Sequence, residues 1–329
     1  MSQTRITRRQ LALGTVAAAI GAPTILSLVS EHAAAQEATP GASSGFADLG
    51  LPTLDITVTN DSFDGMPAET QAGRYLVTVT FAGDLQAGNG AIDFLRPPEG
   101  HTTDELLGIL GMFAQAGASP EAMEMGGTPA ADAEQGGGAP PPVIYQSTFA
   151  GGIGAPNGAT AQVVLDLGPG DWILWGDDPT ASQQPVTFSV TGDLPTDLPA
   201  PQADITCTLV DFAITVDGDL TAGDHIVQVT NEGAEPHFLF VETAPDGLTN
   251  DQFGELVMLP DGATPPANLP YKESDFVPLM IVDTISIGLS AWTTVTLEAG
   301  TYAAACFFPT AGTGEPHAMK GMHTVFTVS

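Results

Sequence analysis

The stretch Gly300-Thr-Tyr-Ala-Ala-Ala-Cys306, followed after ten residues by His317-Ala-Met-Lys-Gly-Met322, decides how the fold of this chain is interpreted. It places a thiol, an imidazole and a thioether within seventeen residues. A second imidazole, that of His237, lies upstream, directly after a proline. A thiolate, two imidazoles and a weakly bound thioether form the ligand set of mononuclear copper sites that transfer electrons. The sequence therefore predicts one metal site with four ligands: His237, Cys306, His317 and Met322.

The rest of the chain is dominated by short runs in which apolar and polar residues alternate. Gly, Pro and Asp separate these runs, which indicates antiparallel sheets with one face in contact with solvent. The clearest runs begin at Asp55, Tyr75, Ala161, Pro185, Asp204, Ile226, Thr293 and Thr324. We predict one short helix in each half, because residues 102–105 and 249–252 have the spacing of a capping box.

An internal repeat relates the two halves of the chain. The run 55–59, Asp-Ile-Thr-Val-Thr, matches the run 204–208, Asp-Ile-Thr-Cys-Thr. The run 170–176 matches the run 300–306, so that a glycine stands opposite Cys306. All four candidate ligands lie in the second copy only, as expected of residues that act together.

The repeat and the local composition together predict the domain organisation. Residues 1–35 are a twin-arginine-like signal peptide, 36–47 a flexible tether, 48–192 a β-sandwich domain without metal ligands, 193–202 a proline-rich linker and 203–329 a β-sandwich domain with the metal site. Within the first domain, residues 113–142 are rich in Gly, Ala, Pro and Glu, which favours a disordered insertion.

The N-terminus has the pattern of an export signal. Arg5, Arg8 and Arg9 precede a mostly apolar run at 11–29, and Ala33-Ala-Ala supplies the small residues that a signal peptidase needs. The Arg-Arg pair resembles a twin-arginine signal, which exports proteins already folded. We expect an exported protein, periplasmic or extracellular, without membrane contact after cleavage. The alternative is an uncleaved N-terminal membrane anchor, although Gly and Pro interrupt the run.

The chain is strongly acidic, with 7 basic and 39 acidic residues. Removal of residues 1–35 would delete three of the basic residues and one of the acidic residues. Such a charge argues against binding to nucleic acid and to anionic membranes. It favours cationic partners or metal ions, although an acidic extracellular surface is the simpler explanation.

The second half resembles the cupredoxin family of blue copper proteins. Plastocyanin-like members carry a Gly-x-Tyr-x-x-x-Cys strand, a Pro and a His in the following loop, and Gly-Met before the last strand. An earlier His follows an Asn-containing turn, as in 231–237 here. The resemblance is close over 203–329 and extends to 48–192 in architecture alone. It implies an all-β fold of two tandem Greek-key β-sandwich domains, each with one short helix in a loop. The implied ligands of one type 1 copper are His237, Cys306 and His317 in the plane and Met322 on the axis.

The ten residues between Cys306 and His317 depart from the pattern of the small electron carriers, which have a shorter loop. Copper nitrite reductases have a longer loop like the one in this chain. Zinc is a competing metal, since two imidazoles and a thiolate with a fourth ligand also satisfy tetrahedral zinc. A metal-free β-sandwich module with a Cys207–Cys306 disulfide is a further alternative, because exported proteins often pair their cysteines. Cys207 alternates with Ile205 and Leu209, however, as a small buried hydrophobic residue would.

The resemblance implies an exported carrier of single electrons, whose acidic surface would attract a cationic redox partner protein. His317 is expected at the solvent edge, with Phe307, Phe308 and Met319 as an apolar docking rim. A copper-binding or copper-delivery protein without a redox partner is the alternative. We expect no enzyme activity, because the sequence lacks the His-x-His pairs of multicopper oxidases and any catalytic triad or paired-carboxylate motif.

Overall fold

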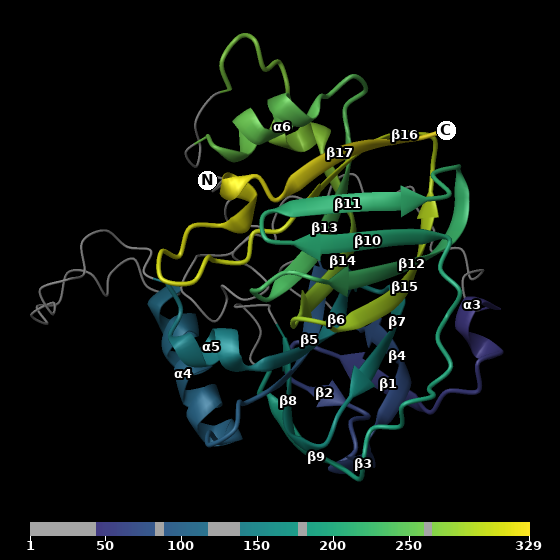
Figure 1. The fold of residues 1–329 in the computed structure, drawn as a ribbon, viewed down its shortest axis with the longest axis vertical. Coiled ribbons are helices and arrows are strands. Elements are labelled where there is room, and N and C mark those ends of the chain that lie inside the picture. Colours follow the sequence, from purple (N-terminus) through teal and green to yellow (C-terminus); the bar gives the residue numbers. More distant parts are fainter. Residues whose placement is uncertain (1–43, 83–88, 118–138, 177–182, 260–264) are drawn as a thin grey trace, which may run out of the picture.

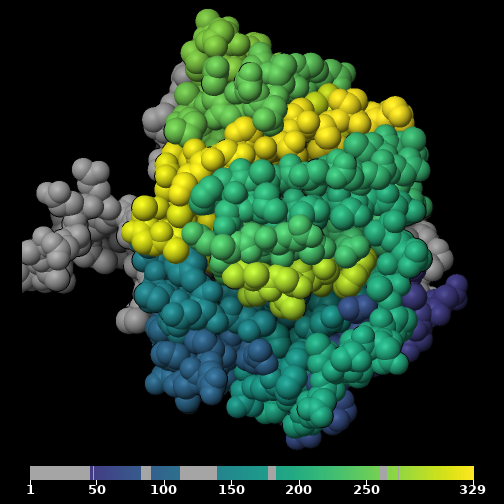
Figure 2. Space-filling model, viewed as in Figure 1, coloured from purple at the N-terminus to yellow at the C-terminus, as the bar shows by residue number. Residues whose placement is uncertain are grey.

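The structure, a computed structural model, describes residues 44–82, 89–117, 139–176, 183–259 and 265–329. Within these residues the fold consists mainly of β-strands in two sheets, and the prediction of an all-β sandwich is confirmed. In Figure 1 the first half of the chain occupies the lower part of the molecule and the second half the upper part. The space-filling view shows the two halves in direct contact (Figure 2).

Each sheet contains strands from both halves of the chain. The first sheet has the order β11 (Ala213–Gly218), β10 (Ile205–Val210), β12 (Gly223–Asn231), β15 (Ser290–Leu297), β7 (Thr160–Leu167), β4 (Gly73–Phe81), β1 (Thr53–Val58) and β2 (Phe63–Asp64). The second has the order β17 (His323–Val328), β16 (Gly300–Ala305), β13 (His237–Ala244), β14 (Val277–Ile285), β6 (Thr148–Pro156), β5 (Asn89–Arg96), β8 (Gly170–Gly176), β9 (Val186–Thr191) and β3 (Glu69–Gln71).

The halves join by strand pairing in both sheets. In the first sheet β15 pairs with β7, where Trp292 lies opposite Val164, and in the second β14 pairs with β6, where Ile281 lies opposite Gly154. Outward from this junction the orders correspond, because β15, β12, β10 and β11 mirror β7, β4, β1 and β2. The two halves therefore share both sheets, and their buried side chains form one large hydrophobic core.

Not every pair of strands is antiparallel as the alternating runs predict. β1 pairs with β4, and β10 with β12, in parallel. The cause is the hairpin at the sheet edge: β11 folds back on β10, and the chain returns as β12 on the other side of β10. The alternation itself is preserved, since β4 runs buried, partly exposed, buried along its whole length.

The two predicted capping boxes are confirmed. Thr102 Oγ1 accepts a hydrogen bond from the Glu105 N–H (3.2 Å), and Glu105 Oε2 accepts one from the Thr102 N–H (2.9 Å). Thr249 and Gln252 make the same reciprocal pair. The helical segments are α3 (Ser44–Ala47), α4 (Thr103–Gly117), α5 (Pro142–Gln146), α6 (Asn250–Val257) and the 3-10 turns η3 (Glu273–Asp275) and η4 (His317–Lys320). The short helices α3 and α5 have no counterpart among the predicted elements.

Part of the segment predicted to be disordered is helical, because α4 continues through residues 113–117 and α5 begins at 142. Residues 118–138 lie outside the described residues, as do 1–43, which include the predicted signal peptide. In the part of the chain that the structure describes, no helix is long and apolar enough to cross a membrane.

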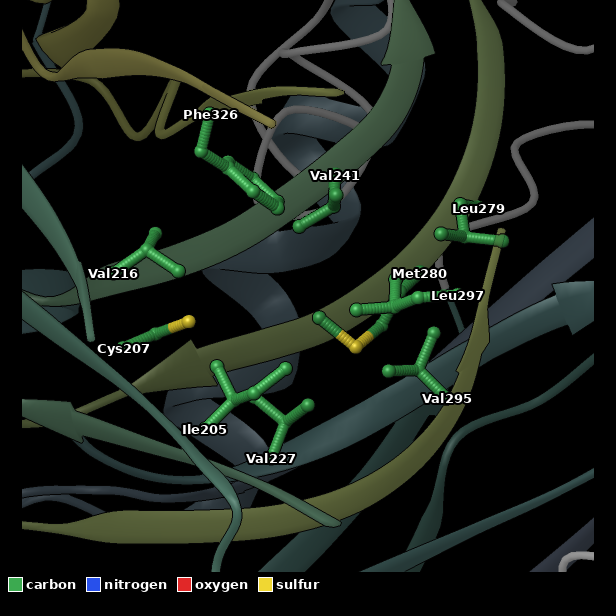
Figure 3. A pocket seen from close by; sticks show the side chains of 10 residues that line it. All are labelled: Ile205, Cys207, Val216, Val227, Val241, Leu279, Met280, Val295, Leu297 and Phe326. Atoms are coloured by element: carbon green, nitrogen blue, oxygen red, sulfur yellow. The ribbon is translucent and has the colours of Figure 1, made fainter. Parts of the chain in front are cut away.

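A small apolar cavity lies between the sheets in the second half. Its lining includes Cys207 on β10 and Met280 on β14, which Figure 3 shows among eight other apolar side chains. Burial, and then the negative charge of Asp217, raise the pKa of the Cys207 thiol to about 12. Cys207 is therefore an unreactive core side chain, in agreement with its strand parity.

The second sheet contains three buried carboxyl groups, those of Asp93, Glu242 and Asp283, and Asp283 is the most deeply buried. Asp283 on β14 has an exposed fraction of 0%, and its Oδ2 has no hydrogen-bond partner among the described residues. Its Oδ1 accepts hydrogen bonds from the N–H and hydroxyl of Thr284. Burial raises the pKa of Asp283 to about 7, although the bonds from Thr284 oppose the rise. The folded protein therefore holds a proton here that the unfolded chain releases near pH 4.

This difference predicts a pH dependence of stability. The contribution of Asp283 is fully present below about pH 4 and is lost as the pH rises through about 7. Asp283→Asn should remove this slope and stabilise the protein at pH 7, as measured by denaturant unfolding across pH 4–8. Asp246→Asn, at an exposed carboxylate, is the control. An unchanged slope in Asp283→Asn would contradict the prediction.

Candidate metal centre

Three neighbouring strands bring the predicted ligands to one end of the second sheet. β13 begins at His237, β16 ends directly before Cys306, and β17 begins directly after Met322. β13 and β17 both pair antiparallel with β16. The starts of β13 and β17 and the end of β16 therefore lie at the same end of the sheet. His317, the first residue of η4, lies between β16 and β17 in the chain.

The donor atoms of three predicted ligands converge at this end of the second sheet. Nδ1 of His237 lies 3.0 Å from Nδ1 of His317, and Sγ of Cys306 lies 3.8 and 3.7 Å from these nitrogens. All three side chains have an exposed fraction of 0%. Their donor atoms lie within 4.8 Å of one another, the one such group of potential metal ligands in the described residues.

The backbone places Met322 beside these three residues. The N–H of Cys306 donates to the carbonyl oxygen of Met322, and the N–H of Met322 donates to that of His317, each at 3.1 Å. The Met322 side chain is fully buried.

The long loop before His317 closes on itself. Pro309 and Pro316 form an isolated β-bridge, and the hydroxyl and N–H of Thr310 hold the turn between them by donating to the carbonyl before Pro316. The N–H of His317 then donates to the carbonyl oxygen of Phe308 at 2.9 Å. The additional residues therefore form a loop that leaves the sheet and returns to it. Cys306 and His317 both remain at this end of the second sheet.

The turn before His237 is fixed by a fully buried amide. Asn231 Nδ2 donates to the carbonyl oxygens of Glu235 (2.8 Å) and Ile285 (2.7 Å), and its Oδ1 accepts from the N–H of Gly233 (2.8 Å). These bonds hold the turn at both ends and join it to β14, so the direction in which β13 begins is set before His237.

A carboxylate lies behind each imidazole. Asp211 Oδ1 is 2.9 Å from Nε2 of His237, and Glu235 Oε2 is 3.1 Å from Nε2 of His317. A glycine is required beside the first pair, because a Cβ atom at Gly233 would lie 2.5 Å from both Asp211 Oδ1 and His237 Nε2. Sequence reasoning missed both carboxylates. The signal for Glu235 was its position two residues before His237, whereas nothing local marks Asp211.

Burial dominates the protonation of the ligands. It lowers the pKa of His237, against the opposing effect of Asp211, and, together with the nearby His237, it lowers the pKa of His317 to about 3. Burial also raises the pKa of the Cys306 thiol to about 12, although backbone N–H groups of Phe238 and Phe308 bond the sulfur. Without a bound cation the two imidazoles are therefore neutral and the thiol is protonated.

The donor set fits a metal ion. Burial alone would raise the pKa of Asp211, but hydrogen bonds from backbone N–H groups and from His237 hold it below its usual range. Carboxylates only accept, so Asp211 and Glu235 draw the single proton of each neutral imidazole to Nε2. Both Nδ1 atoms then carry lone pairs 3.0 Å apart, which a cation between them would stabilise. Metal ions bond imidazole nitrogen at about 2.0 Å and thiolate sulfur at about 2.3 Å, compatible with these spacings.

The predicted solvent edge and docking rim are wrong. His317 is fully buried, and so are Phe307 (4% exposed) and Phe308 (0%), which leaves only Met319 partly exposed. The reason is that the long loop turns back over the histidine: the N–H of Ala311 donates to the same Glu235 oxygen that faces His317.

The remaining candidates lie elsewhere. Cys207 and Cys306 are both free thiols, so the alternative disulfide is not formed. The other histidines in the described residues contact local partners: His101 contacts Glu105, His225 the carbonyl of Thr221, and His323 the side chain of Asn250.

The first half of the chain covers one side of the centre. Tyr145 on α5 donates its hydroxyl hydrogen to the carbonyl oxygen of Pro309 (2.9 Å), and its ring meets Phe308 edge-on with centroids 5.8 Å apart. Phe149 on β6 packs on the same ring. Phe308 in turn lies against His317, at a centroid distance of 5.8 Å. The half without ligands therefore supports the ligand loop.

No protein-family model and no curated protein matches the chain. Similar solved structures include dithionite-reduced auracyanin from Roseiflexus castenholzii, 20% identical over 38% of this chain and 94% of that chain, with a TM-score of 0.25. A multicopper oxidase is 12% identical over 84% of this chain and 88% of its own, with a TM-score of 0.21. Copper nitrite reductase from Nitrosomonas europaea is 11% identical over 84% and 93%, with a TM-score of 0.21. At this level of similarity the matches assign no function to the chain.

The prediction that the protein is not an enzyme is corrected by this comparison, because the similar structures include multicopper oxidases and a copper nitrite reductase. The prediction depended on the absence of short sequence motifs. Folding can bring reactive groups together without such a motif, so that absence does not exclude catalysis.

The two-sheet β fold and the buried His–Cys–His cluster together give the chain a cupredoxin-like fold with a candidate metal centre.

Asn231→Ala should destabilise the protein by about 3 kcal/mol, because it removes three hydrogen bonds in a buried turn at about 1 kcal/mol each. Denaturant unfolding of the metal-free protein measures the change. Asn268→Ala removes one long hydrogen bond at the surface and is the matched control. Equal stability of the two variants would contradict the assigned role of Asn231.

Tyr145→Phe should cost about 1 kcal/mol of stability, because it removes the hydrogen bond to Pro309 and keeps the ring. Tyr271→Phe, which loses a hydrogen bond of 3.4 Å, is the control and should cost less. Thermal unfolding of both variants checks this, and an equal or smaller loss in Tyr145→Phe would show that the contact between the halves is unimportant.

Proposed function

We propose that this protein binds one copper ion as a type 1 centre and transfers single electrons through it. His237, Cys306 and His317 would hold the ion, with Met322 as a fourth, weaker ligand. The observation that carries the proposal is the convergence of two Nδ1 atoms and one sulfur in a fully buried position. Such a position is costly for polar groups unless a cation compensates them.

Copper fits this donor set better than zinc does. Thiolate and thioether are soft ligands that suit copper(I), whereas imidazole suits both oxidation states. Structural zinc sites usually take four Cys or His ligands, and only three such side chains converge among the described residues. Bound copper would supply a one-electron redox couple at the cysteine sulfur.

The contribution of the chain is to hold the donors in place. Cys306 would release its thiol proton when the metal binds, so that copper binding is accompanied by proton release. Hydrogen bonds fix the backbone of the turn held by Asn231 and of the closed loop before His317, and the carboxylates of Asp211 and Glu235 restrict the two imidazoles. A rigid ligand set lowers the rearrangement between oxidation states, which favours fast electron transfer.

The setting of this function is also part of the proposal. The signal-like residues 1–35 support export, to the periplasm or the cell exterior. The strong excess of acidic residues supports a cationic redox partner protein, whose association would weaken as salt rises. If the protein forms a complex with copper(I) only, copper delivery without a redox partner is the favoured function.

The test is a copper titration of the purified metal-free protein. One equivalent of copper(II) should give strong absorption near 600 nm, as the cupredoxin resemblance implies, and reduction should bleach it reversibly. Cys306→Ser should abolish the band, whereas Cys207→Ser, at the cysteine in the apolar cavity, should leave it intact. A colourless protein that binds zinc more tightly than either oxidation state of copper would overturn the proposal.

A further inference from the structure

The two carboxylates behind the imidazoles are built into the centre by separate elements. Asp211 lies at the tip of the β10–β11 hairpin in the first sheet, and Glu235 lies in the turn that precedes β13. Their side chains are 30% and 20% exposed, so each stands between the buried rings and the solvent. Each imidazole therefore has a negative charge on the side away from the cysteine.

The backbone at the first of these positions is unusual. Phe212, directly after Asp211, has a φ of 86°, the one positive φ at a non-glycine residue in the described ranges. A bulky side chain in this region costs about 1–3 kcal/mol and persists where surrounding contacts enforce it. Here the Phe212 ring packs edge-on against His317 (centroids 5.2 Å apart), and Lys320 Nζ lies 4.1 Å from its centre. One strained hairpin tip thus contacts both histidines, one through Asp211 and the other through Phe212.

The second carboxylate is held equally firmly. Glu235 Oε2 accepts from His317 Nε2 at 3.1 Å and from the N–H of Ala311 at 2.9 Å. The backbone of the same residue takes part in the turn, because its carbonyl oxygen accepts from the buried Asn231 amide. Glu235 therefore fixes the ligand loop and the imidazole through one oxygen.

We propose that Asp211 and Glu235 are positioning residues that hold both imidazoles with Nδ1 toward the metal and stabilise the oxidised state of the centre. The inference rests on the proposed copper function and extends it to regulation of the reduction potential. Its physical basis is the charge: two carboxylates, each one imidazole away from the metal, favour the more positive oxidation state. Outer carboxylates of this kind typically change metal affinity by about 10–100-fold.

The experiment compares the copper-loaded wild-type protein with Asp211→Asn, Glu235→Gln and the double variant. An amide oxygen still accepts the Nε2–H bond, so these changes remove charge and keep the hydrogen bond. Glu315→Gln, at an exposed carboxylate two residues before His317, is the matched control for net charge. The reduction potential and the affinities for copper(II) and copper(I) are measured for each protein.

Each of the two single variants should raise the reduction potential, and the ratio of copper(II) to copper(I) affinity should fall about tenfold or more. The double variant should show a larger change, and Glu315→Gln little. Reduction potentials of Asp211→Asn and Glu235→Gln equal to that of Glu315→Gln would overturn the inference. An amide keeps the hydrogen bond, so an unchanged potential would mean that the carboxylates have a structural role only. If Asp211→Asn does not fold, Glu235→Gln decides alone.

Proton positions provide a second, independent readout. Nitrogen-15 NMR of the diamagnetic copper(I) protein should show Nε2–H on both His237 and His317, and nitrogen protonation at Nδ1 of either ring would overturn the inference. A wild-type protein that binds no copper would instead overturn the proposed function itself. The two failures are therefore distinguishable.

Discussion

The metal centre depends on the hydrogen-bond register of three adjacent strands. Because Phe240 on β13 lies opposite Ala305 on β16, the start of β13 overhangs the end of β16 by the few residues needed to bring His237 to the cysteine. On the other side Ala305 lies opposite His323, which brings the chain before β17 to the same place. A slip of one residue would turn a ligand to the opposite face of the sheet. Backbone pairing therefore fixes the ligand geometry before any side chain contributes.

The polar groups of this end are buried in an otherwise apolar sandwich, and their partners explain why that is tolerated. In each of the two imidazoles Nε2 faces a carboxylate and Nδ1 faces the cysteine sulfur, while the backbone supplies N–H groups to the sulfur. With both imidazole protons drawn to Nε2 by the carboxylates, the unfavourable element is the pair of Nδ1 lone pairs. The chain thus keeps one strongly repulsive contact at the point where a cation would relieve it, and surrounds it with satisfied groups.

Sequence reasoning succeeded where the information is local. Alternation along residues 75–81 predicts a half-buried strand, and the Thr–Glu and Thr–Gln spacings predict the helix starts. The four ligand candidates follow from side-chain chemistry and the family resemblance. Asp211 could not be found in this way, because it reaches His237 from the other sheet. Burial of His317 was also missed, since it depends on a loop that folds back through contacts to Glu235 and the first half.

The first half of the chain shows why a repeated fold need not carry a repeated site. Gly176, at the end of β8, occupies the position that corresponds to Cys306 after β16. A Cβ atom at Gly176 would lie 2.7 Å from both the Phe63 ring and the Gln183 side-chain oxygen. The space that a ligand would need is therefore filled by an aromatic ring and an amide. In exchange, Tyr145 and Phe149 of this half pack on Phe308 and close the ligand loop of the other. The two copies thus have different roles: the second carries the metal-binding donor atoms, and the first covers one side of them with packed side chains.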